Sequence, residues 1–275
     1  MPVACSRMQA LRTSFAPMAL EAAAGTTRDT ILGGRITLVQ PRRGHRAGHD
    51  AILLAAAIGA KGGQHAVDLG AGVGAAGLAL AARVARLKLT FVEIDATLAE
   101  LCGENIAHNG FADRARTVVL DVVADARAYR AAGLAPGSAD HVLMNPPFND
   151  PSRRRASPNW ARRLAHSLAP EALSAWVRSA GRLLCARGVL SLIWRADELD
   201  RVLAAIRDGF GDIAVLPIHA RASAAAIRVI VRAIKTSRAP LRVLPALVLS
   251  DETGRPTPQT DAILRGGAAL PIADL

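Results

Sequence analysis

The chain has 275 residues, a mass of 28.7 kDa and a formal charge of +11 at neutral pH. A hydrophobic share of 51% excludes a disordered protein, and an aromatic share of 3% argues against rows of base-stacking rings. Only three of the 34 basic residues are lysines, so the positive charge is carried by arginine. This charge favours an anionic partner, with nucleic acid ahead of a membrane surface, over a merely arginine-rich composition.

Cysteine and histidine give no sign of a disulfide or a metal site. Cys5, Cys102 and Cys185 are far apart, which predicts neither a disulfide framework nor a zinc ribbon. His45 and His49 have helical spacing but no third ligand nearby, so we expect no metal. The apolar runs are shorter than the roughly 20 residues of a membrane span, and the N-terminus lacks the apolar core of a secretory signal. We expect a cytoplasmic monomer without a membrane partner.

The first 60 residues predict a tail followed by a hairpin and a helix. Residues 1–25 are expected to form a flexible N-terminal tail, and Met18 is an alternative start to Met1. Residues 31–40 predict a short strand or hairpin around a Gly-Gly turn, and 41–49 a basic loop. An apolar helix over 50–58 follows.

Strands alternate with helices from residue 65 onward. The expected strands are 65–69, 89–94, 116–120, 140–144 and 188–194. The expected helices are 75–86, 96–109, 122–132, 171–184 and 197–208. This alternation is typical of parallel βαβ units.

The C-terminal part predicts an antiparallel pair at the sheet edge. Residues 212–218 and 227–234 read as strands whose connection is too short for a crossover helix. Residues 241–250 are a candidate for one more strand, and 251–275 for a C-terminal tail. The expected fold is a single α/β domain over 26–250. It is a doubly wound, Rossmann-like, seven-stranded, mostly parallel sheet with an antiparallel edge hairpin.

A glycine-rich turn follows the first strand of this sheet and leaves two cofactors open. Gly72 to Gly77 fits GxGxxG and Glu93 lies 21 residues after Gly72, as in nicotinamide dinucleotide sites. However, Asp68 stands just before the first glycine, where a carboxylate would repel a pyrophosphate and attract a cation. S-adenosylmethionine carries a sulfonium and an ammonium, so Asp68 favours it. The alternative is an aspartate that only caps the turn.

Two further carboxylates end the second and third strands. Glu93 is placed to accept both ribose hydroxyls of either cofactor, the alternative being a solvated strand-end acid. Asp121 is placed to accept from an adenine amine while the Val122 N–H reads the ring, the alternative being a helix cap. Ala71 and Ile94, beside these residues, and Asn145 at the end of the fourth strand complete the predicted cofactor contacts.

The fourth strand ends in Asn145-Pro146-Pro147-Phe148, across the sheet from the glycine turn. Prolines have no amide N–H, so this segment offers acceptors, the Asn145 side-chain oxygen and the Pro146 carbonyl. An acceptor pair suits a substrate –NH₂ group, and Phe148 offers a flat face for a base or amide plane. A Pro-rich turn with a core phenylalanine is the alternative.

Together, DLGAGVG, Glu93, Asp121 and NPPF resemble class I S-adenosylmethionine-dependent methyltransferases that modify exocyclic or amide nitrogens. ILGGRITLVQPRRGHRAGHDAILLAAA and NPPFNDPSRRRASP extend the resemblance to the bacterial tRNA1(Val) adenine-N6 methyltransferase family, over residues 26–265. The resemblance implies a cofactor site of Asp68, Gly70, Gly72, Glu93 and Asp121, and an adenine site of Asn145, Pro146 and Phe148. Many members carry Tyr where this chain has Phe148; both rings stack.

Arginines flank both motifs. Arg153, Arg154 and Arg155 follow the NPPF segment, with Arg162 and Arg163 further on, and Arg42, Arg43 and Arg46 precede the glycine turn. We expect them to contact RNA phosphates; a solvated charged loop is the alternative.

Other functions remain as alternatives. A guanine-N2 rRNA methyltransferase shares the motif, as does a protein glutamine-N5 methyltransferase, although the latter resembles proteins with a helical domain that has no room before Ile31. An NAD-dependent oxidoreductase would leave Asp68 and NPPF unexplained. An RNA-binding protein without catalysis would leave Asn145 and Asp68 unexplained.

Overall fold

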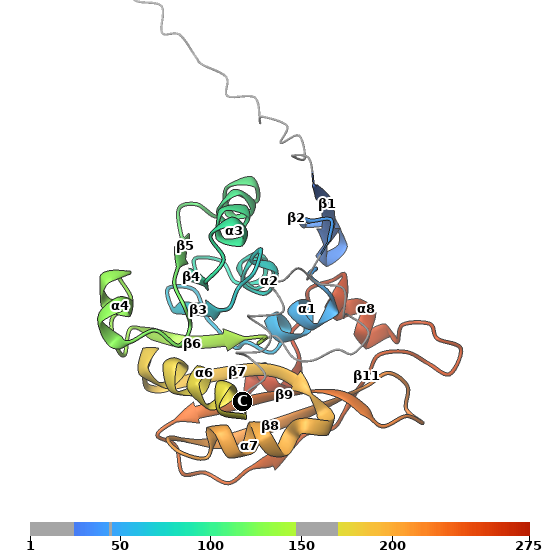
Figure 1. Ribbon diagram of the computed structural model, residues 1–275. Coiled ribbons are helices and arrows are strands. Elements are labelled where there is room, and N and C mark those ends of the chain that lie inside the picture. Colours follow the sequence, from blue (N-terminus) through green and yellow to red (C-terminus); the bar gives the residue numbers. More distant parts are fainter. Residues whose placement is uncertain (1–24, 44–45, 147–169) are drawn as a thin grey trace, which may run out of the picture.

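The computed structural model describes residues 25–43, 46–146 and 170–275, and a central sheet between two helical layers dominates it (Figure 1). The strand order is β10-β8-β9-β7-β6-β3-β4-β5, with β11 also paired to β8. The strands are β3 (His65–Leu69), β4 (Lys88–Glu93), β5 (Ala115–Val119), β6 (Ala139–Met144), β7 (Leu184–Arg195), β8 (Phe210–His219), β9 (Ala226–Lys235), β10 (Arg242–Val243) and β11 (Leu247–Val248). In the described ranges no helix combines the length and apolar character needed to cross a bilayer.

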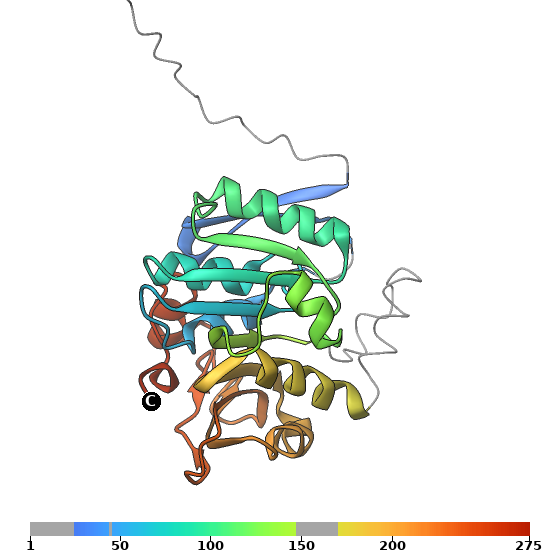
Figure 2. The same cartoon turned by 90° about the vertical axis from the view of Figure 1, so that its left-hand side faces the viewer.

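The predicted doubly wound topology is confirmed. Strands β3 to β7 pair in parallel, and Figure 2 shows β3, β4 and β5 side by side. Strand β9 is antiparallel to both β7 and β8, as the short connection predicted. The sheet has nine strands rather than seven, because β10 and β11 each add a two-residue pairing along β8.

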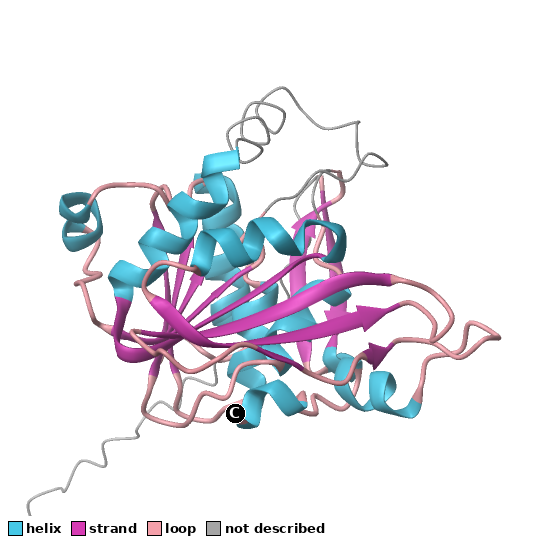
Figure 3. Ribbon diagram, turned by 90° about the horizontal axis from the view of Figure 1, so that it is seen from below, coloured by secondary structure: helices cyan, strands magenta, loops and turns pink. Residues whose placement is uncertain are grey.

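Helices cover both faces of the sheet (Figure 3). One core packs under α1 (His49–Ala56), α2 (Ala75–Arg83) and α3 (Ala96–His108). The other packs under α4 (Ala126–Ala131), α6 (Pro170–Leu183) and α7 (Leu199–Ile206). Successive residues of one strand serve opposite cores: Phe91 faces the first and Val92 the second. Burial on both faces explains the nearly continuous apolar character of these strands.

Helix α4 is shorter than the predicted 122–132, for a local reason. Asp125 caps it, with its carboxylate accepting from the Ala128 amide at 2.8 Å. Residues 122–125 therefore remain a turn beyond β5, at the edge of the sheet.

A separate two-stranded sheet precedes the main one. It consists of β1 (Thr26–Ile31) and β2 (Ile36–Pro41), joined by the 3₁₀ turn η1 (Leu32–Gly34). Asparagine side chains of α3 and of its C-terminal cap hold it in place. Asn105 accepts from the Val39 amide at 2.7 Å and donates to the Val39 carbonyl at 3.0 Å. Asn109 does the same with Thr37, at 2.9 and 2.7 Å, so two side-chain amides take the place of a neighbouring strand.

The prediction of a C-terminal tail over 251–275 is wrong. This segment forms α8 (Pro258–Leu264) and the 3₁₀ turn η4 (Pro271–Asp274). Ile263, Leu270 and Ile272 are buried in the core around α1, and the Leu270 amide donates to the Ala56 carbonyl at 2.8 Å. Glycines and prolines interrupt the apolar residues here, so no helical or strand period marks the segment as core.

Candidate active site

The site lies where four parallel strands end at one edge of the sheet. The pairs Leu69–Val92 and Leu69–Met144 put the ends of β3, β4 and β6 in register, and Glu93–Val119 adds β5. Ligands of open α/β sheets bind at this edge. It brings together the described members of the predicted site: Asp68, Gly70, Ala71, Gly72, Glu93, Ile94, Asp121, Val122, Asn145 and Pro146.

The glycine turn is packed at its ends and open in its middle. Gly70, Gly72 and Gly74 have φ of +70°, +58° and +89°, which side chains rarely adopt. A Cβ on Gly70 would overlap the Trp176 ring, and one on Gly74 would lie 2.7 Å from the Cys102 Sγ. A Cβ on Gly72 would meet nothing within 4 Å. The Gly72 backbone is therefore the place where a ligand can come close.

Asp68 caps helix α2 from inside the turn. Its side chain is 3% exposed, and Oδ2 accepts from the Gly77 amide at 3.0 Å. Burial raises the pKa of Asp68 to about 7; the Gly77 hydrogen bond opposes this shift and the charge of Glu93 adds to it. This contact with helix α2 differs from the alternative of an aspartate that caps the turn itself, and contact with a cofactor stays a prediction.

Glu93 fastens the turn to the end of β4. It is 6% exposed, Oε2 accepts from the Gly72 amide at 2.8 Å, and Oε1 accepts from the Asp95 amide at 2.9 Å. The next side chain, Ile94, is 49% exposed and offers an apolar surface at the mouth of the site. The predicted contact of Glu93 with a ribose stays a prediction.

Asp121 and Val122 form a local turn rather than a helix cap. The exposed Asp121 accepts from the Val123 amide at 2.9 Å through Oδ1. The buried Val122 carbonyl accepts from the Tyr129 hydroxyl at 2.8 Å. Burial raises the pKa of Tyr129 to about 12, so this hydroxyl remains a donor at ordinary pH. The turn that was predicted to read adenine is thereby held by α4.

The acceptor segment is described in part. Asn145 is half-buried and Pro146 buried, immediately after β6. Pro147 and Phe148 lie outside the described residues, as do Arg153, Arg154, Arg155, Arg162 and Arg163. The structure adds Trp176 of α6, which the sequence reading missed. Its spacing from the buried Leu173 and Ala180 would have marked it only as a core residue.

The hairpin arginines differ in their surroundings. Arg46 pairs with Asp29 at 2.7 Å and donates to the Thr27 hydroxyl at 2.9 Å, so it fastens the loop to β1. Arg42 is exposed and donates to the Thr26 carbonyl, and Arg43 is exposed. The two exposed arginines suit a phosphate partner better than Arg46 does.

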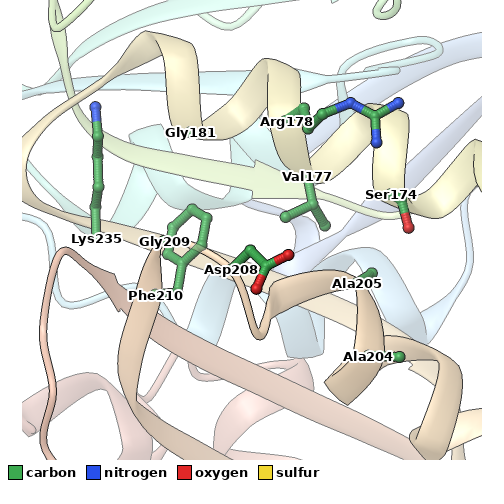
Figure 4. Close-up of a pocket in the computed structure, with 10 residues that line it drawn as sticks. All are labelled: Ser174, Val177, Arg178, Gly181, Ala204, Ala205, Asp208, Gly209, Phe210 and Lys235. Atoms are coloured by element: carbon green, nitrogen blue, oxygen red, sulfur yellow. The ribbon is translucent and has the colours of Figure 1, made fainter.

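A pocket of about 380 Å³ lies elsewhere, between α6, α7 and the start of β8 (Figure 4). Its lining includes Arg178, Phe210 and Lys235. Lys235 pairs with Phe210, and the preceding Ile234 pairs with Val189 near the start of the paired part of β7. The Phe210–Lys235 end of the pocket is therefore at the amino edge, none of the lining residues belongs to the predicted site, and we do not assign the pocket as the active site.

Comparison with known proteins gives the family. The methyltransferase small domain family matches residues 48–219. A solved structure of a predicted O-methyltransferase from Agrobacterium tumefaciens is 31% identical, with a TM-score of 0.69, over 80% of this chain and 98% of that one. A putative transferase from Pyrococcus horikoshii shares the fold at 14% identity, with a TM-score of 0.52, over 78% of this chain and 73% of that one. TrmN from Thermus thermophilus is 20% identical, with a TM-score of 0.47, over 67% and 47%. No curated protein matches the chain.

The geometry fits the cofactor of these enzymes. The Gly72 backbone is open and its amide donates to the Glu93 carboxylate, so negative charge lies at the turn, which suits a cationic ligand better than an anionic pyrophosphate. This arrangement favours S-adenosylmethionine over the nicotinamide alternative. The chain belongs to the methyltransferase small domain family and is an S-adenosylmethionine-dependent methyltransferase.

Proposed function

We propose that this enzyme methylates an exocyclic nitrogen of a nucleic-acid base, and that the acceptor is adenine N6 in tRNA. One observation carries the proposal: Asn145 follows β6 at the position next to Gly70 of the cofactor turn. The resemblance of the NPPF segment to adenine-N6 methyltransferases supports the choice of acceptor. The enzyme would act as a cytoplasmic monomer on RNA.

The chemistry required of the chain is modest. Bound S-adenosylmethionine supplies an electrophilic methyl group on its sulfonium. The Asn145 Oδ1 and the Pro146 carbonyl would accept the two N–H bonds of the base amine. This draws the nitrogen lone pair out of conjugation with the ring and aims it at the methyl group. The same two oxygens stabilise the positive charge that develops on nitrogen as the methyl–sulfur bond would break, and alignment supplies much of the remaining acceleration. The methylated amine would then lose a proton to water.

Substrate binding would use the arginines. A base has to leave its stack to reach the edge of the sheet, which costs least in a loop. Arg42 and Arg43, together with Arg153, Arg154 and Arg155 outside the described residues, would hold RNA phosphates. Charge reversal at Arg154 and Arg155 is expected to weaken RNA binding and flatten its salt dependence; unchanged affinity and slope would refute this contact.

Labelled S-adenosylmethionine with total tRNA and, separately, rRNA tests the reaction. The products are hydrolysed and identified as nucleosides by mass spectrometry. Labelled N6-methyladenosine from tRNA supports the proposal, N2-methylguanosine from rRNA replaces it by the guanine enzyme, and an O-methylated nucleoside overturns nitrogen transfer. Label found only in protein glutamine would overturn an RNA acceptor.

A variant pair tests the role of Asn145. Asn145→Ala is expected to lower turnover by about 10²–10³ while retaining S-adenosylhomocysteine binding in calorimetry. Asn145→Asp keeps an acceptor oxygen and is expected to retain more activity than Asn145→Ala. Turnover like that of the wild type in Asn145→Ala would exclude the proposed mechanism.

A further inference from the structure

Trp176 lies against the first glycine of the cofactor turn. A Cβ built on Gly70 would overlap the ring at Cη2 and lie 2.9 Å from Cζ3, so the benzo edge of the indole rests on the Gly70 backbone. Helix α6 supplies this ring from the face of the sheet opposite α1 and α2. Gly70 also has φ +70°, and both features exclude a side chain at this position.

The sheet register places this contact beside the predicted acceptor site. Leu69 of β3 pairs with Met144 of β6, so Gly70 and Asn145 occupy successive positions on two adjacent parallel strands. Adjacent strands are about 4.8 Å apart. The Trp176 ring therefore touches the one residue of the cofactor turn that stands next to Asn145.

Trp176 packs at the margin of the second core and is not enclosed by it. Its neighbours Leu173, Val177 and Ala180 on α6 are buried, whereas Trp176 is only half-buried. Within the described part of the chain its indole N–H has no hydrogen-bond partner. Trp194 shows the contrast, since it is 6% exposed and donates to Glu198 at 3.0 Å. Tryptophans in a core usually satisfy their N–H, and a half-exposed ring with an available donor suits a ligand.

We propose that Trp176 forms a side wall of the methyl-transfer site, beside both the bound cofactor and the acceptor base, and helps to select a flat, aromatic acceptor. The part of this inference that concerns the acceptor base rests on the proposed function. The part that concerns the cofactor rests only on the contact of Trp176 with Gly70. The indole edge limits how the acceptor enters beside Asn145, and its N–H offers one donor to a base. Trp176 would be a positioning residue for the acceptor.

Tryptophan fluorescence tests the proposed contact of Trp176 with the bound cofactor. In a Trp160→Phe, Trp194→Phe protein, Trp176 is the only tryptophan left. We expect its emission to change on titration with S-adenosylhomocysteine, with the dissociation constant that calorimetry gives for the same protein. Unchanged emission at calorimetric saturation would overturn the inference. This result does not depend on which substrate is methylated, so it is separable from a failure of the proposed function.

Methylation kinetics with RNA as the acceptor test the proposed contact between Trp176 and the acceptor base. Trp176→Ala is expected to raise KM for RNA about tenfold while changing the S-adenosylhomocysteine dissociation constant less than about threefold, and Trp176→Phe to fall between it and the wild type. Phe210→Ala is the matched control, because Phe210 packs on Gly181 of the same helix at the far edge of the sheet, 3.6 Å from a Cβ built there. Equal kinetics of Trp176→Ala and Phe210→Ala would overturn the acceptor contact. If Trp176→Ala does not fold, Trp176→Phe and the fluorescence titration decide.

Discussion

The Glu93 carboxylate accepts a 2.8 Å hydrogen bond from the Gly72 amide, which joins the end of β4 to the turn after β3. The residue that the sequence assigns to a cofactor ribose thus also shapes the turn that the cofactor approaches. A hydrogen bond to a charged group contributes about 1.5–3 kcal/mol, so this contact is among the stronger polar ones at the site.

Glu93→Gln is expected to weaken cofactor binding by about 10- to 100-fold. The amide that replaces one oxygen turns a donor toward Gly72 or Asp95, and one of the two backbone amides loses its acceptor. Calorimetric titration with S-adenosylhomocysteine measures the effect. Glu100→Gln on the exposed side of α3 serves as the control and should bind like the wild type. Equal affinities for all three proteins would contradict a structural role for Glu93.

Asp68 makes stability depend on pH in a defined direction. Burial raises its pKa from 3.8 to about 7, so the folded protein binds a proton that the unfolded chain releases between these values. The stabilising contribution is full below about pH 4 and is lost as the pH rises through 7, with a slope of at most about 1.4 kcal/mol per pH unit. Asp68→Asn still accepts from Gly77 but cannot titrate.

Urea unfolding at several pH values between 4 and 8 checks this prediction. The stability of the wild type relative to Asp68→Asn should fall as the pH rises, and the exposed Asp113→Asn should follow the wild type. A constant difference between the wild type and Asp68→Asn across this range would show that Asp68 has an ordinary pKa.

Asn105 and Asn109 make the same pairing with β2 but in different surroundings. Asn105 is fully buried and also donates to the Val73 carbonyl at 3.0 Å, so it connects the hairpin to the cofactor turn. Asn105→Ala leaves three backbone groups without a partner, and we expect a loss of about 3 kcal/mol or more in unfolding free energy. Asn109→Ala, where water can replace the amide, should cost about 1 kcal/mol. Denaturant unfolding compares them, and equal losses would argue against the role of burial.

The hairpin arginines should separate into two classes. Arg42→Glu with Arg43→Glu is expected to weaken RNA binding and to reduce the salt slope by about 2, because each lost phosphate contact removes about one counterion. Arg46→Ala should leave that slope nearly unchanged and lower stability by about 1 kcal/mol or less, since Arg46 is paired with Asp29. Filter binding over a series of salt concentrations distinguishes the classes. If Arg46→Ala changed the salt slope of RNA binding more than Arg42→Glu with Arg43→Glu does, the assignment of the two classes would be reversed.

The parts that sequence predicted best depend on local chemistry. The glycine-rich turn was predicted from its glycines, and Gly70, Gly72 and Gly74 do adopt positive φ angles there. The alternation of strands and helices fixes which strand ends share an edge. The antiparallel pairing of β9 follows from a connection too short to cross the sheet. These features need no knowledge of distant contacts.

The parts that sequence missed depend on packing between distant segments. Trp176 meets Gly70 only because α6 lies across the end of β3. Leu270 and Ile272 are buried because the α1 face has to be covered, and no period marks them. The sequence motif assigns both acids to ligand contacts, so it does not predict the hydrogen bonds of Glu93 with Gly72 and of Asp68 with Gly77.

Strand β9 lies between β7 and β8 although it is made after both. While the chain is synthesised, β8 leaves the ribosome before the strand that separates it from the sheet. The edge of β7 stays unpaired until residue 235 has emerged, and a nascent chain halted before that point exposes an apolar strand edge to other chains. The synthesis of β9 therefore sets when this edge of β7 stops being available to other chains.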